Sequence, residues 1–167
     1  PVLERLLPEI SSTQALIIVP SRELALQIEQ VFKTMSTGYK ITCCYGGHLR
    51  ETEENNLMEA PALIVGTAGR LADHIRRGNI SIDTIHTLVL DEFDKSLELG
   101  FEAEMSFIIG SLPSIRKRML TSATDTRDIP AFIGLKDPVK LNFITGETKE
   151  MLDFRVVHSD INDKLET

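Results

Sequence analysis

Thr87-Leu88-Val89-Leu90-Asp91-Glu92-Phe93-Asp94 is an apolar run that ends abruptly in three carboxylates. Four consecutive apolar or β-favouring residues are typical of a buried strand in a parallel sheet. In open α/β sheets, ligands bind where such strands end. Carboxylates at that point suit a Mg²⁺–nucleotide site, in which one holds the metal and another orients the attacking water. A strand followed by a solvated acidic turn is the alternative that this stretch leaves open by itself.

Composition bounds the size of the domain and the kinds of partner it can have. A chain of 167 residues suits one domain with a sizeable core, and 42% hydrophobic residues is ordinary for a globular protein. The net charge of −7 argues against non-specific coating of DNA, which needs a basic surface. Contacts with nucleic acid would therefore use backbone amides, helix N-termini and a few placed arginines.

The only two cysteines, Cys43 and Cys44, are adjacent in the sequence. Neighbouring side chains on a strand point to opposite faces, so we expect no disulfide between them. Two cysteines alone offer too few ligands for a metal site. We interpret them as small strand residues in a protein of the reducing cytoplasm.

Strand and helix patterns alternate along the chain. Strands are expected at 15–19, 41–45, 62–65, 87–90, 118–120 and 139–143. Helices are expected at 24–38, 50–59, 69–77, 102–112 and 129–135, the second of them polar and exposed. The alternation predicts an α/β fold, a three-layer, doubly wound and mainly parallel sheet with right-handed crossovers.

Four further segments follow expected strand ends, where such a fold places its site. They are Pro20-Ser21-Arg22, Gly46-Gly47, Thr67-Ala68-Gly69-Arg70 and Ser122-Ala123-Thr124. Ser21 and Thr67 can cap a helix whose free amides would face a phosphate, and an arginine follows each of them. Paired glycines allow close approach of the backbone to a ligand, and the two hydroxyls can bond a carboxylate. Each segment alone is better explained as an ordinary cap or turn.

Together, in order and spacing, the five segments resemble the N-terminal RecA-like domain of DEAD-box ATP-dependent RNA helicases. Residues 20–27 resemble the family's PTRELAxQ motif, 46–47 its double glycine, 67–70 its TPGR motif, 91–94 its name-giving tetrad and 122–124 its SAT motif. The resemblance implies a RecA-like fold of the P-loop NTPase type over nearly the whole chain.

Three residues depart from the family's motifs. Ser21 replaces threonine, Ala68 replaces proline, and Phe93 replaces the small alanine of the tetrad. Alanine keeps the helix start, so RNA contact should survive at Ala68. The Phe93 ring is expected to pack behind the site. The fourth residue of the tetrad is Asp94 and not histidine, which favours the DEAD-box group over the related DEAH group.

The resemblance implies ATP and Mg²⁺ as cofactors. Asp91 and Glu92 would bind Mg²⁺, and Glu92 would also align the hydrolytic water. Asp94 would bond Ser122 and Thr124, which ties the state of the nucleotide to closure of the domains. These five residues are the expected cofactor-binding set, with Asp91 and Glu92 catalytic.

RNA is the partner that the resemblance implies, bound through its backbone and independently of sequence. The expected RNA-binding residues are Pro20, Ser21, Arg22, Gly46, Gly47, Thr67, Gly69 and Arg70. A second RecA-like domain of the same chain is the other implied partner, and no membrane is expected.

The sequence has no match to the family's phosphate-binding loop, G-x-x-x-x-G-K-[ST]. Residues 1–7 look like the end of the helix that follows that loop. We therefore expect residues 1–144 to be an N-terminally truncated RecA-like helicase domain 1, 145–153 an interdomain linker, and 154–167 the start of domain 2. The full-length protein would locally unwind or remodel RNA, whereas this segment alone would be inactive.

Three alternatives stay open. A non-catalytic module that binds RNA or protein would explain the missing phosphate loop. A DNA-directed translocase of the same superfamily would carry similar motifs. A phosphorylation-type switch domain could use the acidic cluster, although it would not need the double glycine or Arg70.

Overall fold

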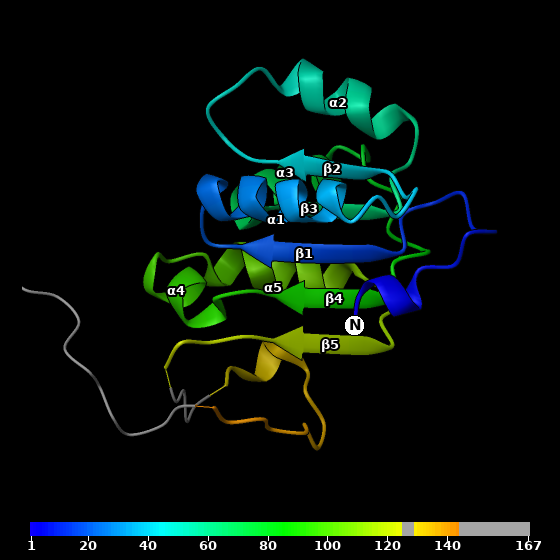
Figure 1. The fold of residues 1–167 in the computed structure, drawn as a ribbon. Coiled ribbons are helices and arrows are strands. Elements are labelled where there is room, and N and C mark those ends of the chain that lie inside the picture. The colour runs from blue at the N-terminus through cyan, green and yellow to red at the C-terminus, as the bar shows by residue number, and fades with distance from the viewer. Residues whose placement is uncertain (125–128, 144–167) are drawn as a thin grey trace, which may run out of the picture.

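The structure is a computed structural model that describes residues 1–124 and 129–143. Five parallel strands form one sheet in the order β2-β3-β1-β4-β5 (Figure 1). The strands are β1 (Ala15–Val19), β2 (Ile41–Cys44), β3 (Leu63–Thr67), β4 (Thr87–Leu90) and β5 (Lys117–Leu120). The predicted doubly wound parallel sheet is confirmed. The expected linker at 145–153 and second domain at 154–167 lie outside the described residues.

Helices cover both faces of the sheet. They are α1 (Arg22–Thr34), α2 (Arg50–Met58), α3 (Ala68–Arg76), α4 (Phe93–Glu98) and α5 (Glu102–Ser111), with short 3₁₀ turns η1 (Leu3–Arg5) and η2 (Ala131–Ile133). Helix α1 lies in front of the sheet in Figure 1, α3 and α5 lie behind it, and α2 lies beside the edge strand β2. None of the described helices is both long and apolar enough to cross a membrane.

The two faces of β1 explain why its sequence is continuously apolar. Leu16 and Ile18 pack into a cluster with α3 and α5, whereas Ala15, Ile17 and Val19 pack against α1. A strand buried on both faces needs apolar side chains at every position, which is the pattern of a central parallel strand. All five residues of β1 are buried.

Several sequence-based expectations at the ends and edges were wrong. The polar helix α2 is not fully exposed, because Glu53 and Leu57 are buried on its inner side. The expected helix at 129–135 is only the 3₁₀ turn η2, and residues 1–7 contain only the 3₁₀ turn η1. Helix α4, directly after the acidic strand, was not predicted.

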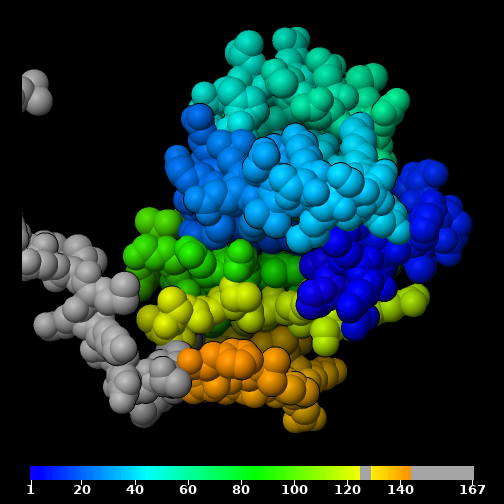
Figure 2. All heavy atoms as spheres, in the orientation of Figure 1, coloured from blue at the N-terminus to red at the C-terminus, as the bar shows by residue number. Residues whose placement is uncertain are grey.

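The expected strand at 139–143 is also wrong. The segment is described but pairs with no described strand, and Val139, Leu141 and Phe143 are 88%, 75% and 86% exposed. Alternating apolar residues form a strand only where a neighbouring strand supplies hydrogen bonds and a covered face. Figure 2 shows residues 129–143 lying along the outer side of the sheet beyond β5.

Candidate functional site

All five candidate segments follow the carboxyl ends of parallel strands and therefore lie along one edge of the sheet, here called the carboxyl edge. Gly46-Gly47 follows β2, Thr67 to Arg70 follows β3, and Pro20 to Arg22 follows β1. The acidic tetrad follows β4, and Ser122 to Thr124 follows β5. The strand order thus places the glycine and arginine segments on one half of the edge and the carboxylates with the hydroxyls on the other.

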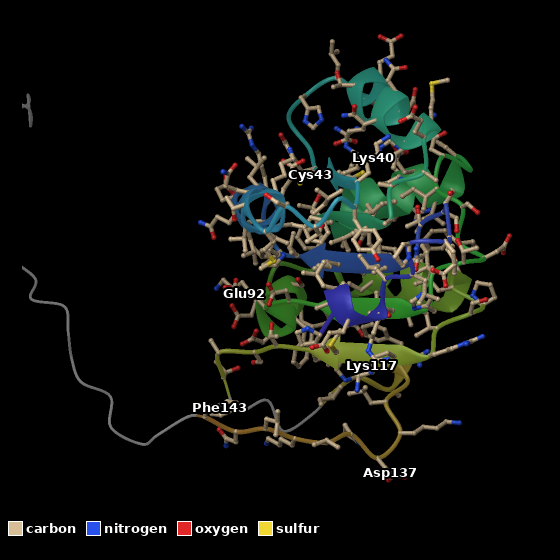
Figure 3. All side chains as sticks on the ribbon, turned by 45° about the vertical axis from the view of Figure 1, so that its right-hand side comes forward. Lys40, Cys43, Glu92, Lys117, Asp137 and Phe143 are labelled. Atoms are coloured by element: carbon tan, nitrogen blue, oxygen red, sulfur yellow. The ribbon has the colours of Figure 1, made fainter. Side chains whose placement is uncertain are left out.

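Thr121 organises the acidic half. Its hydroxyl donates a hydrogen bond to Asp91 Oδ1, and its oxygen accepts the Glu92 N–H at 3.0 Å. The Asp91 N–H in turn donates to the Ile18 carbonyl of β1 at 2.9 Å. The two carboxylate residues are therefore held by both neighbouring strands. Figure 3 shows Glu92 at the end of the sheet toward which the strands point.

Glu92 has a left-handed backbone, with φ 47° and ψ 50°. Residues other than glycine, asparagine or aspartate adopt this region rarely, and such conformations cluster at functional sites. Here it lets the chain turn from β4 into α4 within two residues and leaves the Glu92 side chain exposed next to the half-buried Asp91. Two carboxylates are thereby presented together at the carboxyl edge.

Asp94 and the hydroxyl segment are joined directly. Thr124 Oγ1 donates to Asp94 Oδ2 at 2.8 Å, and Ser122 Oγ lies 3.3 Å from Thr124 Oγ1. Partial burial raises the pKa of Asp94, but hydrogen bonds from Thr124 and Ser122 and from nearby backbone amides outweigh it and hold the pKa below its ordinary value. The expected contact between Asp94 and this segment is present.

On the other half of the edge, Ser21 caps α1 as expected, because its hydroxyl accepts the Leu24 N–H at 3.2 Å. The exposed Arg22 guanidinium lies 5.3 Å from the centre of the Tyr45 ring. Gly47 has φ +97°, and a Cβ placed there would lie 3.5 Å from Arg22 Nη1. The double glycine therefore makes a turn that passes close to Arg22.

Thr67 does not make the expected cap: no hydrogen bond joins its side chain to α3, although it is the residue before that helix. Arg70 is held inward. Its Nε lies 3.4 Å from the buried carboxylate of Glu53, and its Nη2 donates to the His48 carbonyl at 3.3 Å. Arg70 is thus tied to the turn that follows the double glycine.

Residues 1–132 match the family model of the DEAD/DEAH box helicases. The chain belongs to this family. Its sequence is 40% identical over 149 residues to the ATP-dependent RNA helicase DRS1 of Coccidioides immitis, covering 84% of this chain and 18% of that protein. It is 37% identical over 150 residues to DRS1 of Saccharomyces cerevisiae, covering 84% and 20%. The chain therefore spans about a fifth of the length of these curated relatives.

Solved DEAD-box structures have the same fold. A DEAD box protein from the hyperthermophile Methanococcus jannaschii superposes with a TM-score of 0.69 at 31% identity, covering 76% of this chain and 35% of that one. A hypothetical ATP-dependent RNA helicase from Sulfolobus tokodaii gives a TM-score of 0.64 at 28% identity, covering 72% and 36%. The RecA-like fold of this DEAD-box domain is thereby established.

The unusual residue of this DEAD-box tetrad, Phe93, lies behind the site as expected. Its side chain is 3% exposed and packs in the core cluster that includes α3 and α5. Its N–H donates to the Thr121 carbonyl at 3.1 Å. The ring therefore anchors the start of α4 while its two neighbours, Glu92 and Asp94, stay at the surface.

The donor set of the DEAD-box carboxylates suits a hard cation. Asp91 and Glu92 offer carboxylate oxygens, which are the ligands that Mg²⁺ takes together with water and phosphate oxygens. A Mg²⁺ ion bound there would neutralise charge on the phosphates of a nucleotide.

Three residues of this DEAD-box site were not predicted from the sequence. Thr121 directly precedes the hydroxyl segment, so its position after β5 was a usable signal. Tyr45 and Glu53 gave no comparable signal, since a tyrosine after a strand and a glutamate in a polar helix are both common. Their contacts depend on the packing of α2 against β2.

Proposed function

We propose that this domain is the N-terminal RecA-like part of an ATP-dependent RNA helicase that binds ATP–Mg²⁺ and RNA and locally unwinds or remodels RNA. The observation that carries the proposal is the strand order. It puts the acidic tetrad and the hydroxyl segment on β4 and β5, adjacent along the carboxyl edge to the segments on β1, β3 and β2. A nucleotide and a nucleic-acid backbone would then bind to neighbouring parts of one rigid edge.

In this proposal the acidic half serves hydrolysis. Asp91, fixed by Thr121, holds Mg²⁺, and the exposed Glu92 orients the attacking water. Asp94 and Thr124 join the end of β4 to the end of β5. A change in the position of the tetrad on nucleotide binding is thereby passed to Ser122 and Thr124.

The other half serves RNA. The free amides at the start of α1 and α3, together with Arg22 and Arg70, suit phosphate oxygens. Pro20, Ser21 and the glycines shape the backbone beside them. Contacts of this kind address phosphate and sugar, so binding would be largely independent of sequence. The overall charge of −7 makes these few cations the local attraction for RNA.

A second RecA-like domain of the same protein would close over this edge and complete hydrolysis. We also propose that the protein works in the cytoplasm, a compartment in which thiols such as the free Cys43 and Cys44 stay reduced.

The proposal is tested with the full-length protein in two assays, hydrolysis of ATP and separation of a short duplex. We expect single-stranded RNA to stimulate hydrolysis, and DNA of the same sequence to stimulate it much less, because only RNA carries the 2′-hydroxyl. Equal stimulation by DNA would favour the DNA-directed translocase.

The competing candidate is a non-catalytic module that binds RNA. RNA binding by the full-length protein without any hydrolysis of ATP would favour this candidate over the helicase.

A further inference from the structure

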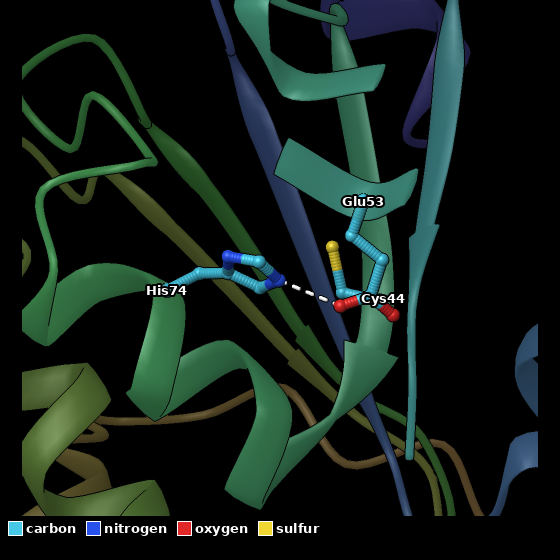
Figure 4. Close-up of side chains that lie close together, drawn as sticks. All are labelled: Cys44, Glu53 and His74. Carbon is cyan, nitrogen blue, oxygen red and sulfur yellow. Dashed lines mark hydrogen bonds and ion pairs between the residues drawn. The ribbon is translucent and has the colours of Figure 1, made fainter. Parts of the chain in front are cut away.

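Glu53 of α2 is a buried carboxylate, 1% exposed, and lies beneath the turn that contains Gly46-Gly47. Its Oε1 accepts the Tyr45 N–H at 2.7 Å and lies 3.0 Å from His48 Nε2. Its Oε2 lies 2.6 Å from His74 Nε2 and 3.4 Å from Arg70 Nε (Figure 4 shows the contact with His74). Buried carboxylates are rare unless donors or cations satisfy them. Here each oxygen has one hydrogen bond, from the Tyr45 N–H and from His74, and His48 and Arg70 lie within ion-pair distance.

The proton on His74 can be assigned from its other ring nitrogen. Asn79 Nδ2 lies 3.0 Å from His74 Nδ1 and 3.3 Å from Glu54 Oε1. An amide nitrogen that donates to the carboxylate of Glu54 also donates to Nδ1, so Nδ1 acts as an acceptor. His74 therefore carries its proton on Nε2 and donates it to Glu53.

The ligand-type atoms of Cys44, Glu53 and His74 lie within 4.8 Å of one another. Figure 4 shows these three side chains gathered beside β2. Two features favour a hydrogen-bonded cluster over a metal centre. Both oxygens of Glu53 already have donors, and the Arg70 cation lies beside them. Burial, and then the charge of Glu53, raise the pKa of the Cys44 thiol far above its ordinary value.

The contacts of Glu53 link the three segments that follow β1, β2 and β3, the half of the carboxyl edge proposed to bind RNA. His48, which contacts Glu53 through its ring, also accepts a hydrogen bond from Arg70 Nη2 at its carbonyl, at 3.3 Å. The rings of His48 and Tyr45 meet edge to face at 4.5 Å, and Arg22 lies over Tyr45. The start of α1, the glycine turn and Arg70 of α3 thus form one contact chain. Glu53 is the buried charged residue in that chain.

We propose that Glu53 is a positioning residue for RNA binding, which fixes the glycine turn and Arg70 in a single arrangement before RNA arrives. The inference rests on the proposed RNA site and adds a residue to it that does not itself touch RNA. A preorganised turn and arginine lose less freedom on binding, so the affinity for RNA is higher. Without Glu53, Arg70 and the turn would sample several positions.

The test compares Glu53→Gln with Glu51→Gln in the full-length protein. Both residues lie in the first turn of α2 and lose the same charge, but Glu51 is exposed. The probe is a fluorescently labelled oligouridylate, and its dissociation constant is measured by anisotropy. We expect Glu53→Gln to raise this constant by about fivefold to tenfold and Glu51→Gln to leave it within about twofold. In RNA-stimulated hydrolysis, the KM for RNA should rise while kcat at saturating RNA stays unchanged.

A double mutant separates this inference from the proposed function. If Arg70→Ala alone leaves RNA affinity unchanged, the proposed RNA site is wrong. If Arg70→Ala weakens binding but Glu53→Gln does not, only the positioning role is wrong. With both correct, Glu53→Gln should add little to Arg70→Ala, because the residue it positions is gone.

Two further measurements keep the test decisive. His48→Ala removes one link from a half-exposed position, so the fold should survive, and it should weaken RNA binding in the same direction as Glu53→Gln. Unchanged affinity in a folded His48→Ala variant would contradict the contact chain. Loss of RNA affinity on treatment with EDTA in Mg²⁺-free buffer, restored by Zn²⁺, would reassign the cluster as a metal centre and overturn the proposal.

Discussion

Thr124 donates a hydrogen bond of 2.8 Å to Asp94, a residue 30 positions earlier in the chain. The bond joins the segment after β5 to the start of α4, and the Ser122 side chain adds a hydrogen bond to the same carboxylate. Because these hydrogen bonds favour the charged carboxylate, they stabilise the folded domain only while Asp94 is ionised. Removing the Thr124 hydroxyl therefore tests how strongly the segment after β5 is coupled to the start of α4.

We expect Thr124→Val to lower the free energy of unfolding by about 1 kcal/mol at neutral pH, since the hydrogen bond of its hydroxyl to Asp94 is lost. The pKa of Asp94 is depressed in the folded state, so its contribution is present above the ordinary value of 3.8 and is lost as pH falls through the lower, folded value. The difference between variant and wild type should thus narrow as pH falls from neutrality toward and below 3.8. Urea unfolding across this range measures it, with Thr52→Val on the exposed side of α2 as control.

Phe93→Ala should create a cavity and lower the free energy of unfolding by about 3–5 kcal/mol, because the ring is 3% exposed. Phe143→Ala is the matched control, since that ring is 86% exposed and its loss should change stability by less than about 0.5 kcal/mol. Chemical denaturation of both variants checks the pair. Equal midpoints would mean that the Phe93 ring does not anchor the tetrad.

The central sheet could be predicted because each strand carries its own signal. The run at 15–19 is apolar at every position and the run at 87–90 is apolar after Thr87, as burial on both faces demands, and the polar breaks after them mark the carboxyl edge. The segment at 139–143 alternates apolar and polar residues, as a half-buried strand would, and yet it is not a strand. Its state depends on a partner for pairing, and a local pattern carries no information on that partner.

The site was predicted to the extent that it lies in short motifs at strand ends. Asp94 and Thr124 could be paired in advance from the resemblance to the family. Glu53 could not, because a helix as polar as α2 gives no sign that one glutamate faces inward. Thr67 was misjudged for a related reason: a hydroxyl before a helix is a cap only if its rotamer allows it.

Glu92→Gln in the full-length protein should reduce the turnover of ATP at least about tenfold, which is more than about 1.4 kcal/mol in barrier. The amide keeps the size of the side chain but cannot orient water as a carboxylate does, so ATP binding should persist. Glu102→Gln, an exposed residue at the start of α5, is the control. Turnover close to wild type would refute the proposed role of Glu92.

Arg22→Ala should weaken the binding of unrelated single-stranded RNAs to a similar degree. The guanidinium is exposed at the start of α1 and would contact phosphate rather than bases. The slope of log affinity against log salt should fall by about one phosphate contact. Arg116→Ala, which removes an exposed arginine just before the start of β5 at the opposite edge, should leave the slope unchanged. An effect confined to particular sequences would indicate base readout.

The 167-residue chain alone should not bind ATP with micromolar affinity. The β- and γ-phosphates need a cradle of backbone amides and a lysine, and the sequence has no loop of that pattern. Lys33, Lys95 and Lys117 do not replace it. Lys33 pairs with Glu29 on α1 at 2.9 Å, Lys95 pairs with Glu98 on α4 at 2.7 Å, and Lys117 begins β5 at the edge away from the site.

Without the phosphates, Asp91 and Glu92 have no ligand to complete the shell of a Mg²⁺ ion, which binds proteins through few carboxylates. Calorimetric titration of the chain with ATP and Mg²⁺ checks this expectation, and its folded state is verified beforehand by a cooperative unfolding transition. Heat of binding in the micromolar range, abolished by Asp91→Asn, would mean that the carboxylate edge recruits the nucleotide by itself. The phosphate loop would then be dispensable for ATP binding, and the requirement for a cradle would have to be abandoned for this domain.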